Sequence, residues 1–190
     1  MPDAISIIVP VFDEEDNVLP MAKEMAAAFA DSRNDWELVF VDDCSRDRTW
    51  EKIAEAAEAD SHVRGFRLEK NSGQSAAVWT GINGTDRPLI ATLDGDLQND
   101  PADLPKLLHE LSDCDFTCGW RHNRRDTFVK RISSRVARWF RCRALKSDFK
   151  DTGCAVRVFK RDCVRAMFGF NGLHRFMPII VQGAGFKCRE

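Results

Sequence analysis

Two aspartates separated by one glycine are the residues of this chain best suited to hold a divalent cation. Asp94-Gly95-Asp96 directly follows the apolar run 89–93, and a turn at this place can direct both carboxylates to one cation. Mg²⁺ and Mn²⁺ prefer oxygen ligands and often keep coordination positions open for substrate phosphates, while glycine lets the backbone approach closely. Because acids are common in turns, this pattern alone is weak evidence for a cation site, and the residues around it must support the assignment.

Two further clusters of acidic and polar residues follow apolar runs in the same way. Residues 10–16 come after the run 5–9, and residues 42–47 come after the run 38–41. In an open α/β sheet, ligands bind beyond the carboxyl ends of the strands. One acidic cluster could simply cap the helix that follows it, whereas three clusters at one edge of a sheet suggest a binding site.

The elements that must position these clusters alternate along the chain. Short apolar runs predict buried strands at 5–9, stopping at Pro10, and at 38–41, 63–68, 89–93, 116–118 and 154–159. Helical spacing of apolar residues predicts helices near 18–29, 50–57, 73–82 and 104–111. This order predicts an α/β fold with a mostly parallel sheet and helices on both faces, formed by the 190 residues as a single domain.

Some details of these elements can be predicted as well. Apolar spacing places four residues on the buried face of the second helix: Trp50, Ile53, Ala54 and Ala57. We expect Asp47 or Ser45 to cap that helix and Asp103 to cap the fourth. Residues 171–175 are expected to form a loop, and 177–181 to begin a last apolar segment.

The charge of the chain is divided unevenly. The net charge is −2, but residues 1–120 carry −15 and residues 121–190 carry +13. Ten Lys and Arg residues lie between Arg121 and Lys146, interleaved with apolar residues at helical spacing, which predicts a basic amphipathic helix. Such a surface favours an anionic partner, either a membrane surface, phosphate groups or nucleic acid. A merely solvated helix face is the weaker interpretation.

Missing motifs exclude several classes of protein. The chain has no P-loop, no G-x-G-x-x-G dinucleotide motif and no G-x-S-x-G nucleophile elbow. The seven cysteines form no C-x-x-C pair, so we interpret them as reduced, mostly buried thiols, and the four histidines as isolated surface or loop residues. No apolar run approaches the ~20 residues that cross a bilayer, and residues 1–4 do not resemble a signal peptide, so a cytosolic chain is expected.

Several short motifs follow one another along the chain, namely Ile7 to Glu15, Val41 to Asp47, Asn71-Ser72-Gly73-Gln74, Leu93 to Gln98, Asp151-Thr152-Gly153 and Arg175-Phe176. In this order they resemble the family 2 glycosyltransferases. The branch that the chain resembles is that of the dolichol-phosphate mannosyltransferase-like enzymes, which act on polyprenyl phosphates. The resemblance covers nearly the whole chain.

The resemblance implies a GT-A fold, which is Rossmann-like, and an inverting transfer of sugar from a UDP- or GDP-linked donor with Mg²⁺ or Mn²⁺. Nucleotide-binding positions would be Pro10, Phe12, Glu14, Asp42, Asp43, Gln74 and Asp94. The metal on the donor diphosphate would be held by Asp94, Asp96 and Gln98. Catalytic positions would be Asp151, as the base for a hydroxyl acceptor, and the phosphate-neutralising Arg121, Arg131 and Arg135. Residues 1–120 would form the donor and metal half and residues 121–190 the basic acceptor half.

The chain also departs from the family's pattern. The family usually has Tyr at Phe12, Asn at Asp13, Gly at Cys44 and Phe at Ser72, and this chain contains no Tyr. The family usually continues past the strand near Phe186-Lys187 into a further basic segment, whereas this chain ends at Glu190. We therefore expect the acceptor half to be truncated.

The acceptor implied by the resemblance is a polyprenyl phosphate or another glycan acceptor, with no nucleic acid involved. The basic helix would contact the membrane surface, so the expected location is cytoplasmic, at the inner face of the membrane. Two alternatives remain at this point. One is a Mg²⁺-dependent phosphatase or phosphotransferase with Asp94 as nucleophile, and the other is a catalytically inactive module that binds anionic ligands.

Overall fold

The computed structural model describes residues 4–32, 34–120, 149 and 151–190 of the chain. Its strands are β1 (Ile5–Val11), β2 (Trp36–Asp42), β3 (Val63–Arg67), β4 (Leu89–Thr92), β5 (Phe116–Cys118), β6 (Arg157–Lys160) and β7 (Cys188–Arg189). Its α-helices are α1 (Val18–Phe29), α2 (Thr49–Ala59), α3 (Gln74–Asn83), α4 (Asp103–Glu110) and α6 (Leu173–Gly183). Short 3₁₀ turns cover Leu111–Asp113 and Arg161–Ala166. The predicted basic helix between Arg121 and Lys146 lies outside the described residues.

The described strands form one seven-stranded sheet in the order β3-β2-β1-β4-β6-β5-β7. Strands β3, β2, β1 and β4 are mutually parallel, and β5 is parallel to β7. Strand β6 runs antiparallel to both of its neighbours, β4 and β5. The sheet is therefore mostly parallel, as the alternation of strands and helices predicts.

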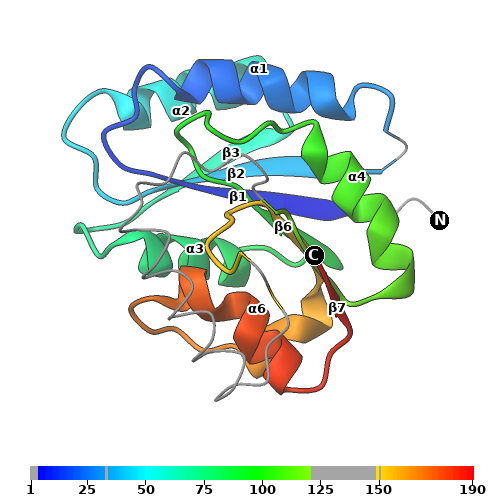
Figure 1. The fold of residues 1–190 in the computed structure, drawn as a ribbon. Helices are drawn as coiled ribbons and strands as arrows, with labels where there is room; N and C mark the ends of the chain where they lie inside the picture. The colour runs from blue at the N-terminus through cyan, green and yellow to red at the C-terminus, as the bar shows by residue number, and fades with distance from the viewer. Residues whose placement is uncertain (1–3, 33, 121–148, 150) are drawn as a thin grey trace, which may run out of the picture.

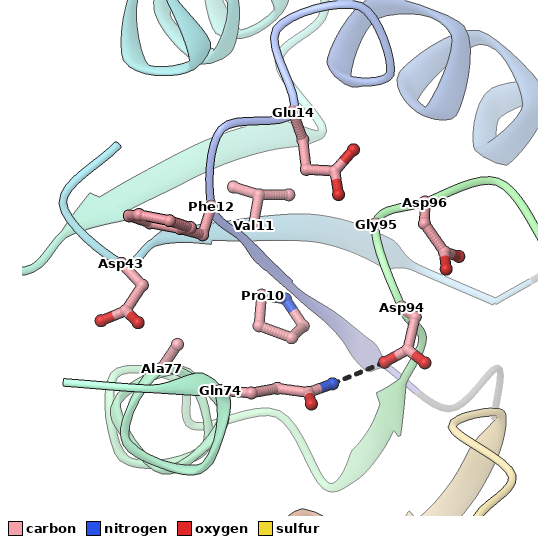
Figure 2. Close-up of a pocket in the computed structure, with 10 residues that line it drawn as sticks. All are labelled: Pro10, Val11, Phe12, Glu14, Asp43, Gln74, Ala77, Asp94, Gly95 and Asp96. Atoms are coloured by element: carbon pink, nitrogen blue, oxygen red, sulfur yellow. Dashed lines mark hydrogen bonds between the residues drawn. The ribbon is translucent and has the colours of Figure 1, made fainter. Parts of the chain in front are cut away.

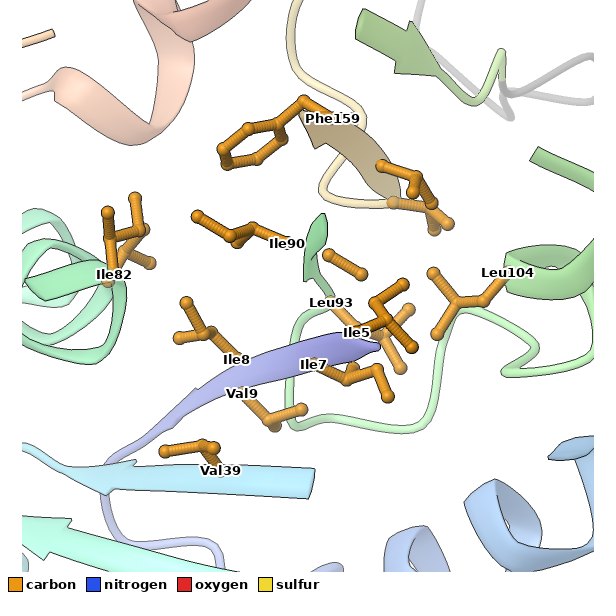
Figure 3. Close-up of a cluster of buried hydrophobic side chains, with 14 of the residues drawn as sticks. Ile5, Ile7, Ile8, Val9, Val39, Ile82, Ile90, Leu93, Leu104 and Phe159 are labelled. Atoms are coloured by element: carbon orange, nitrogen blue, oxygen red, sulfur yellow. The ribbon is translucent and has the colours of Figure 1, made fainter. Parts of the chain in front are cut away.

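Helices cover both faces of this sheet (Figure 1). Helices α1 and α2 pack against each other on one face, where α4 also contacts α1, and α3 and α6 pack together on the other. The core between the layers is built from the buried residues of β1, β2 and β4 and the helices above and below them (Figure 3). All of Ile5, Ile7, Ile8 and Val9 are fully buried, as expected for a central strand that is covered on both sides.

Strand β1 runs through Pro10 and ends at Val11, two residues beyond its predicted end at Val9. The ladder between β1 and β4 ends at the pair Ile8 and Thr92, so Pro10 lies past it. The ladder to β2 continues to Val11, whose carbonyl accepts a hydrogen bond from the N–H of Asp43. Because the missing N–H of Pro10 faces the side where no partner strand remains, proline costs no ladder hydrogen bond here.

Four predictions about helices were wrong in detail. Helix α2 buries Thr49, Ile53 and Ala56, while Ala54 is exposed. Residues 173–175, which were expected in a loop, form the first turn of α6, which follows Gly172 in the left-handed conformation. Helix α4 begins at Asp103 itself, and the carboxylate of Asp100 accepts the N–H of Ala102 just before it. The cap predicted for α2 is also wrong, because the residue at its N-cap is Arg48, whose side chain makes no capping hydrogen bond. Asp47, just before it, accepts the backbone N–H of Thr49 at 3.0 Å.

Candidate functional site

A pocket of about 270 Å³ opens at the edge of the sheet where β1, β2 and β4 end. Its lining comes from the segments that follow these strands and from the start of α3: Pro10, Val11, Phe12, Glu14, Asp43, Gln74, Ala77, Asp94, Gly95 and Asp96. Figure 2 shows Phe12 and Asp43 on one side of Pro10, and Asp94 and Asp96 on the other. The three acidic clusters of the sequence therefore meet at one edge, where ligands of α/β proteins bind.

Gly95 allows the turn between the two aspartates to lie directly on β1. A Cβ atom at this position would stand 2.7 Å from Cγ1 of Val11 and 3.2 Å from the carbonyl oxygen of Pro10. No side chain fits in that space without moving β1 or the turn. Gly95 thus holds Asp94 and Asp96 against the end of the central strand.

Asp43 joins the end of β2 to the start of α3. Its two carboxylate oxygens accept the backbone N–H groups of Ser72 and Gly73, each at 2.7 Å. The next residue, Gln74, donates from Nε2 to Oδ1 of Asp94 at 2.7 Å (Figure 2). The residues that begin α3 therefore bridge the pocket from Asp43 on one side to the turn Asp94-Gly95-Asp96, the D-x-D turn, on the other.

The loops after β1 and β2 are held together by hydrogen bonds. Asp42 is fully buried, and its Oδ1 accepts both the N–H and the O–H of Ser45 at 2.9 and 2.5 Å. Ser45 Oγ in turn accepts the N–H of Asp13 at 2.9 Å. Arg67 forms an ion pair with Asp42 Oδ2 at 3.1 Å. Asp42 therefore supports the pocket from behind and is not part of its lining.

Arg46 covers the outer side of the loop after β1. Its guanidinium lies 5.1 Å from the centre of the Phe12 ring and pairs with Asp13 Oδ2 at 2.6 Å. The pKa of the Asp13 carboxyl is lowered mainly because it accepts a hydrogen bond from the backbone N–H of Arg46. The hydrogen bond from the Arg46 guanidinium lowers this pKa further. Phe12 is consequently fixed between the pocket and a stacked cation.

The acidic residues of the pocket fit a divalent cation that is shared with a ligand. Asp94 and Asp96 supply carboxylate oxygens, and Figure 2 shows both at the same end of the pocket. Among the residues that the structure describes, no group of three or more His, Cys, Asp or Glu side chains could hold a metal. A site with two carboxylates leaves positions for water and substrate phosphates, which is how Mg²⁺ is usually bound.

Some predicted site residues lie away from this pocket. Gln98 is exposed, does not line the pocket, and donates its backbone N–H to Asp96 Oδ1. Asp151 is buried outside the lining, and its Oδ1 accepts the N–H of Gly153 at 3.1 Å, as in a turn. The predicted phosphate-binding residues lie outside the described part: Arg121, Arg131 and Arg135.

Sequence reasoning missed a histidine that contacts the start of α3. Nδ1 of His174, on α6, lies 2.6 Å from the hydroxyl of Ser75, next to Gln74. The sequence favours isolated surface or loop positions for all four histidines, and for His174 this prediction is wrong. No local signal links His174 with Ser75, because 99 positions separate them in the chain.

The fold is that of the GT-A glycosyltransferases. Glucosyl-3-phosphoglycerate synthase of Mycobacterium tuberculosis superposes with a TM-score of 0.75 and 17% identity, over 98% of this chain and 70% of that chain. The same enzyme in complex with Mn²⁺, UDP and phosphoglyceric acid gives a TM-score of 0.77 at 16% identity, over 98% and 67%. Mannosyl-3-phosphoglycerate synthase of Rubrobacter xylanophilus gives 0.75 at 16% identity, over 98% and 65%.

Residues 6–168 match the model of Glycosyl transferase family 2, and the chain belongs to this family. It is 36% identical over 183 residues to a dodecaprenyl-phosphate galacturonate synthase of Rhizobium johnstonii, over 94% of this chain and 54% of the relative. It is 35% identical over 183 residues to an undecaprenyl-phosphate 4-deoxy-4-formamido-L-arabinose transferase of Shewanella sediminis, over 95% and 55%. The chain therefore spans about half the length of these curated relatives. In the described part of the chain, no helix has the length and apolarity to cross a membrane.

Proposed function

We propose that this chain is the catalytic domain of an inverting, metal-dependent glycosyltransferase that uses a nucleotide-sugar donor. The observation that carries the proposal is the pocket itself. It places Phe12 and Asp43 at one end and two carboxylates, Asp94 and Asp96, at the other. An aromatic ring and a hydrogen-bond acceptor suit a nucleoside, while a pair of carboxylates suits a cation that is bound to a diphosphate.

The residues of the chain act on the donor mainly by placing it. Phe12 would pack against the nucleoside, Asp43 would accept hydrogen bonds from the base, and Asp94 and Asp96 would hold the cation that accompanies the diphosphate. A bound Mg²⁺ or Mn²⁺ supplies positive charge that stabilises the leaving nucleoside diphosphate. The acceptor then attacks the anomeric carbon from the face opposite the diphosphate, so the configuration inverts. We assign Glu14 to the same donor pocket, since it contributes to the lining.

A polyprenyl phosphate is the acceptor that the relatives favour. The dodecaprenyl-phosphate and undecaprenyl-phosphate enzymes cover 94% and 95% of this chain. A lipid phosphate is already ionised at neutral pH and needs no general base. Asp151 would serve as base only for a hydroxyl acceptor. Arg121, Arg131 and Arg135 are proposed to neutralise phosphates, and the basic segment 121–146 to contact the cytoplasmic face of the membrane.

Calorimetry of donor binding tests the metal site. In the presence of Mn²⁺ we expect UDP or GDP to bind more tightly than in the presence of a chelator. Asp96→Asn should abolish this metal-dependent gain, because it removes a charged oxygen ligand. Asp100→Asn is the matched control, because Asp100 is an exposed acid in the same loop. Asparagine keeps the side-chain oxygen that accepts the N–H of Ala102. An unchanged metal-dependent affinity in Asp96→Asn would contradict the proposal.

A further inference from the structure

The turn that begins α3, from Ser72 to Ala77, makes the polar contacts that connect both ends of the donor pocket. Ser72 and Gly73 donate to Asp43, and Gln74 donates to Asp94. Yet the start of this helix has no side-chain cap of its own, because its N-cap residue is Gly73, with φ of 87°. In the absence of a local cap, contacts from other elements must fix the position of this turn, and the carboxylate of Asp43 provides one of them.

A further contact with this turn comes from α6, where His174 lies 99 positions along the chain from Ser75. Ser75 is buried in the first turn of α3, and its hydroxyl oxygen lies 2.6 Å from Nδ1 of His174 on α6. The same oxygen accepts the backbone N–H of Gly172 at 3.0 Å, just before α6 begins. One side chain of α3 therefore contacts both the first turn of α6 and the residue that precedes it.

The contacts of His174 define which of its nitrogens carries the proton. Nε of Arg175 donates to Nε2 of His174 at 3.2 Å, so Nε2 must offer a lone pair. In the neutral ring the proton is then on Nδ1, which donates it to Ser75. The hydroxyl oxygen of Ser75 has two lone pairs, and these accept the protons from His174 and Gly172. The neutral Nδ1–H form satisfies all three contacts at once.

We propose that His174 is a positioning residue of the donor pocket, which acts through Ser75 to fix the first turn of α3 and thereby the contacts of that turn with Asp43 and Asp94. The role in donor binding rests on the function proposed above. His174 does not line the pocket and touches no group assigned to the donor or the cation. Its effect should therefore be transmitted through the position of Gln74 and of the two backbone N–H groups.

Two substitutions separate the hydrogen bond from the shape of the ring. His174→Phe keeps a planar ring but loses the N–H, whereas His174→Asn places an amide N–H near the position of Nδ1. His62→Phe is the matched control. His62 also bonds an oxygen at 2.8 Å and stacks on Trp36, but it directly precedes β3, at the opposite end of the parallel strands from the pocket. Ser75→Ala removes the shared hydroxyl without enlarging a side chain.

Hydrogen exchange of the unliganded protein measures the turn directly. We expect the amides of Ser72, Gly73, Ala76 and Ala77 to exchange about tenfold faster in His174→Phe and Ser75→Ala, because local opening of the turn becomes easier. His174→Asn should stay close to the wild type, and His62→Phe should leave these amides unchanged. Equal exchange in His174→Phe and the wild type would overturn the proposal, whatever the protein binds.

Binding of UDP or GDP with Mn²⁺ measures the consequence for the pocket. We expect the metal-dependent part of the affinity to fall about tenfold in His174→Phe, at the low end of the effect of outer-shell residues on metal sites. Rescue by His174→Asn supports a positioning role. If His174 were needed only for stability, His174→Phe would lower the melting temperature and leave the metal-dependent part of the affinity unchanged. Faster exchange with unaltered metal-dependent affinity would overturn the role in donor binding. A wild-type chain that binds no nucleoside diphosphate contradicts the proposed function itself, and the exchange data then decide on His174.

Discussion

At the scale of single residues, Gly95 is important because it has no side chain and so lets the turn between Asp94 and Asp96 lie against β1. The backbone at this position lies on Val11 and on the carbonyl of Pro10, which are both part of the pocket wall. The sequence suggests this role, because a glycine between two aspartates after a buried strand permits close approach. It does not reveal which strand the turn approaches, since β1 and β4 become neighbours only through the order of the sheet.

We expect Gly95→Ala to displace the D-x-D turn. Its methyl group would lie 2.7 Å from Val11, and relieving such overpacking typically costs about 1–3 kcal/mol. The free energy of unfolding should fall by that amount, and the Mn²⁺-dependent affinity for UDP or GDP should fall with it. Denaturant titration and calorimetry measure the two effects.

Gly183→Ala is the control for this substitution. Gly183 ends α6, and a Cβ at this position has nothing within 4 Å. Adding a methyl group there should leave the affinity unchanged and should not lower the stability, because alanine is a better helix former than glycine. If Gly95→Ala behaves in the same way, Gly95 does not hold the turn in place.

Strained backbone also marks the candidate site. Among the described residues, three that are not glycine have positive φ, namely Asp13, Cys44 and Leu97, with values of 55°, 63° and 57°. Each of them follows one of the strands β1, β2 and β4 that end at the pocket. Such conformations are uncommon and cluster at functional sites. Cys44 gives no hint of this in the sequence, although the family that the chain resembles usually has glycine there.

At the scale of elements, periodicity predicts the core better than the ends. The apolar spacing of α1 predicts Val18, Ala22, Met25 and Phe29 on its buried face. Three of them are buried, and Ala22 is half-buried. It fails at Pro10 because a proline inside a strand is tolerated once the neighbouring strand has ended, and strand length cannot be read from one strand alone. It fails at Leu173 because the helix starts after a left-handed Gly172, which resembles an ordinary loop glycine.

The contact between α3 and α6 makes the stability of the fold sensitive to pH. Burial lowers the pKa of His174 below its ordinary value of 6.5, and the charges of Arg175 on α6 and Arg157 on β6 lower it further. The unfolded chain therefore binds a proton at a higher pH than the folded chain. The stabilisation is fully present above pH 6.5 and is lost as the pH falls from there through the folded-state pKa.

Urea denaturation at pH 7.5 and at pH 5.5 measures this dependence. We expect the wild type to lose more stability than His174→Asn between the two values, because asparagine keeps the N–H for Ser75 but does not titrate. Other titrating groups are common to both proteins and cancel in the difference. Identical losses in the two proteins would show that protonation of His174 does not affect the fold.

At the scale of the whole molecule, the donor pocket can be predicted from the sequence and the acceptor side cannot. The acidic residues of the pocket lie in segments that follow strands, and parallel strands bring their carboxyl ends to one edge. Asp43, Asp94 and Asp96 therefore meet as expected. Asp151 and Gln98 were placed by resemblance alone, and their positions depend on turns whose direction the sequence does not determine. Residues 1–120 carry −15 and residues 121–190 carry +13, in keeping with the cation proposed at Asp94 and Asp96 and with the anionic acceptor proposed for the basic remainder.

Release of a nucleoside diphosphate from a nucleotide-sugar tests the central claim most directly. The chain is incubated with a panel of UDP- and GDP-linked sugars and Mn²⁺, and the nucleoside diphosphate is quantified with and without a short-chain polyprenyl phosphate. The account predicts slow, metal-dependent cleavage of at least one donor by water, which is lost in Asp96→Asn and retained in Asp100→Asn. Hydrolysis of simple phosphomonoesters without cleavage of any donor, or donor cleavage that is equal in Asp96→Asn, would contradict it.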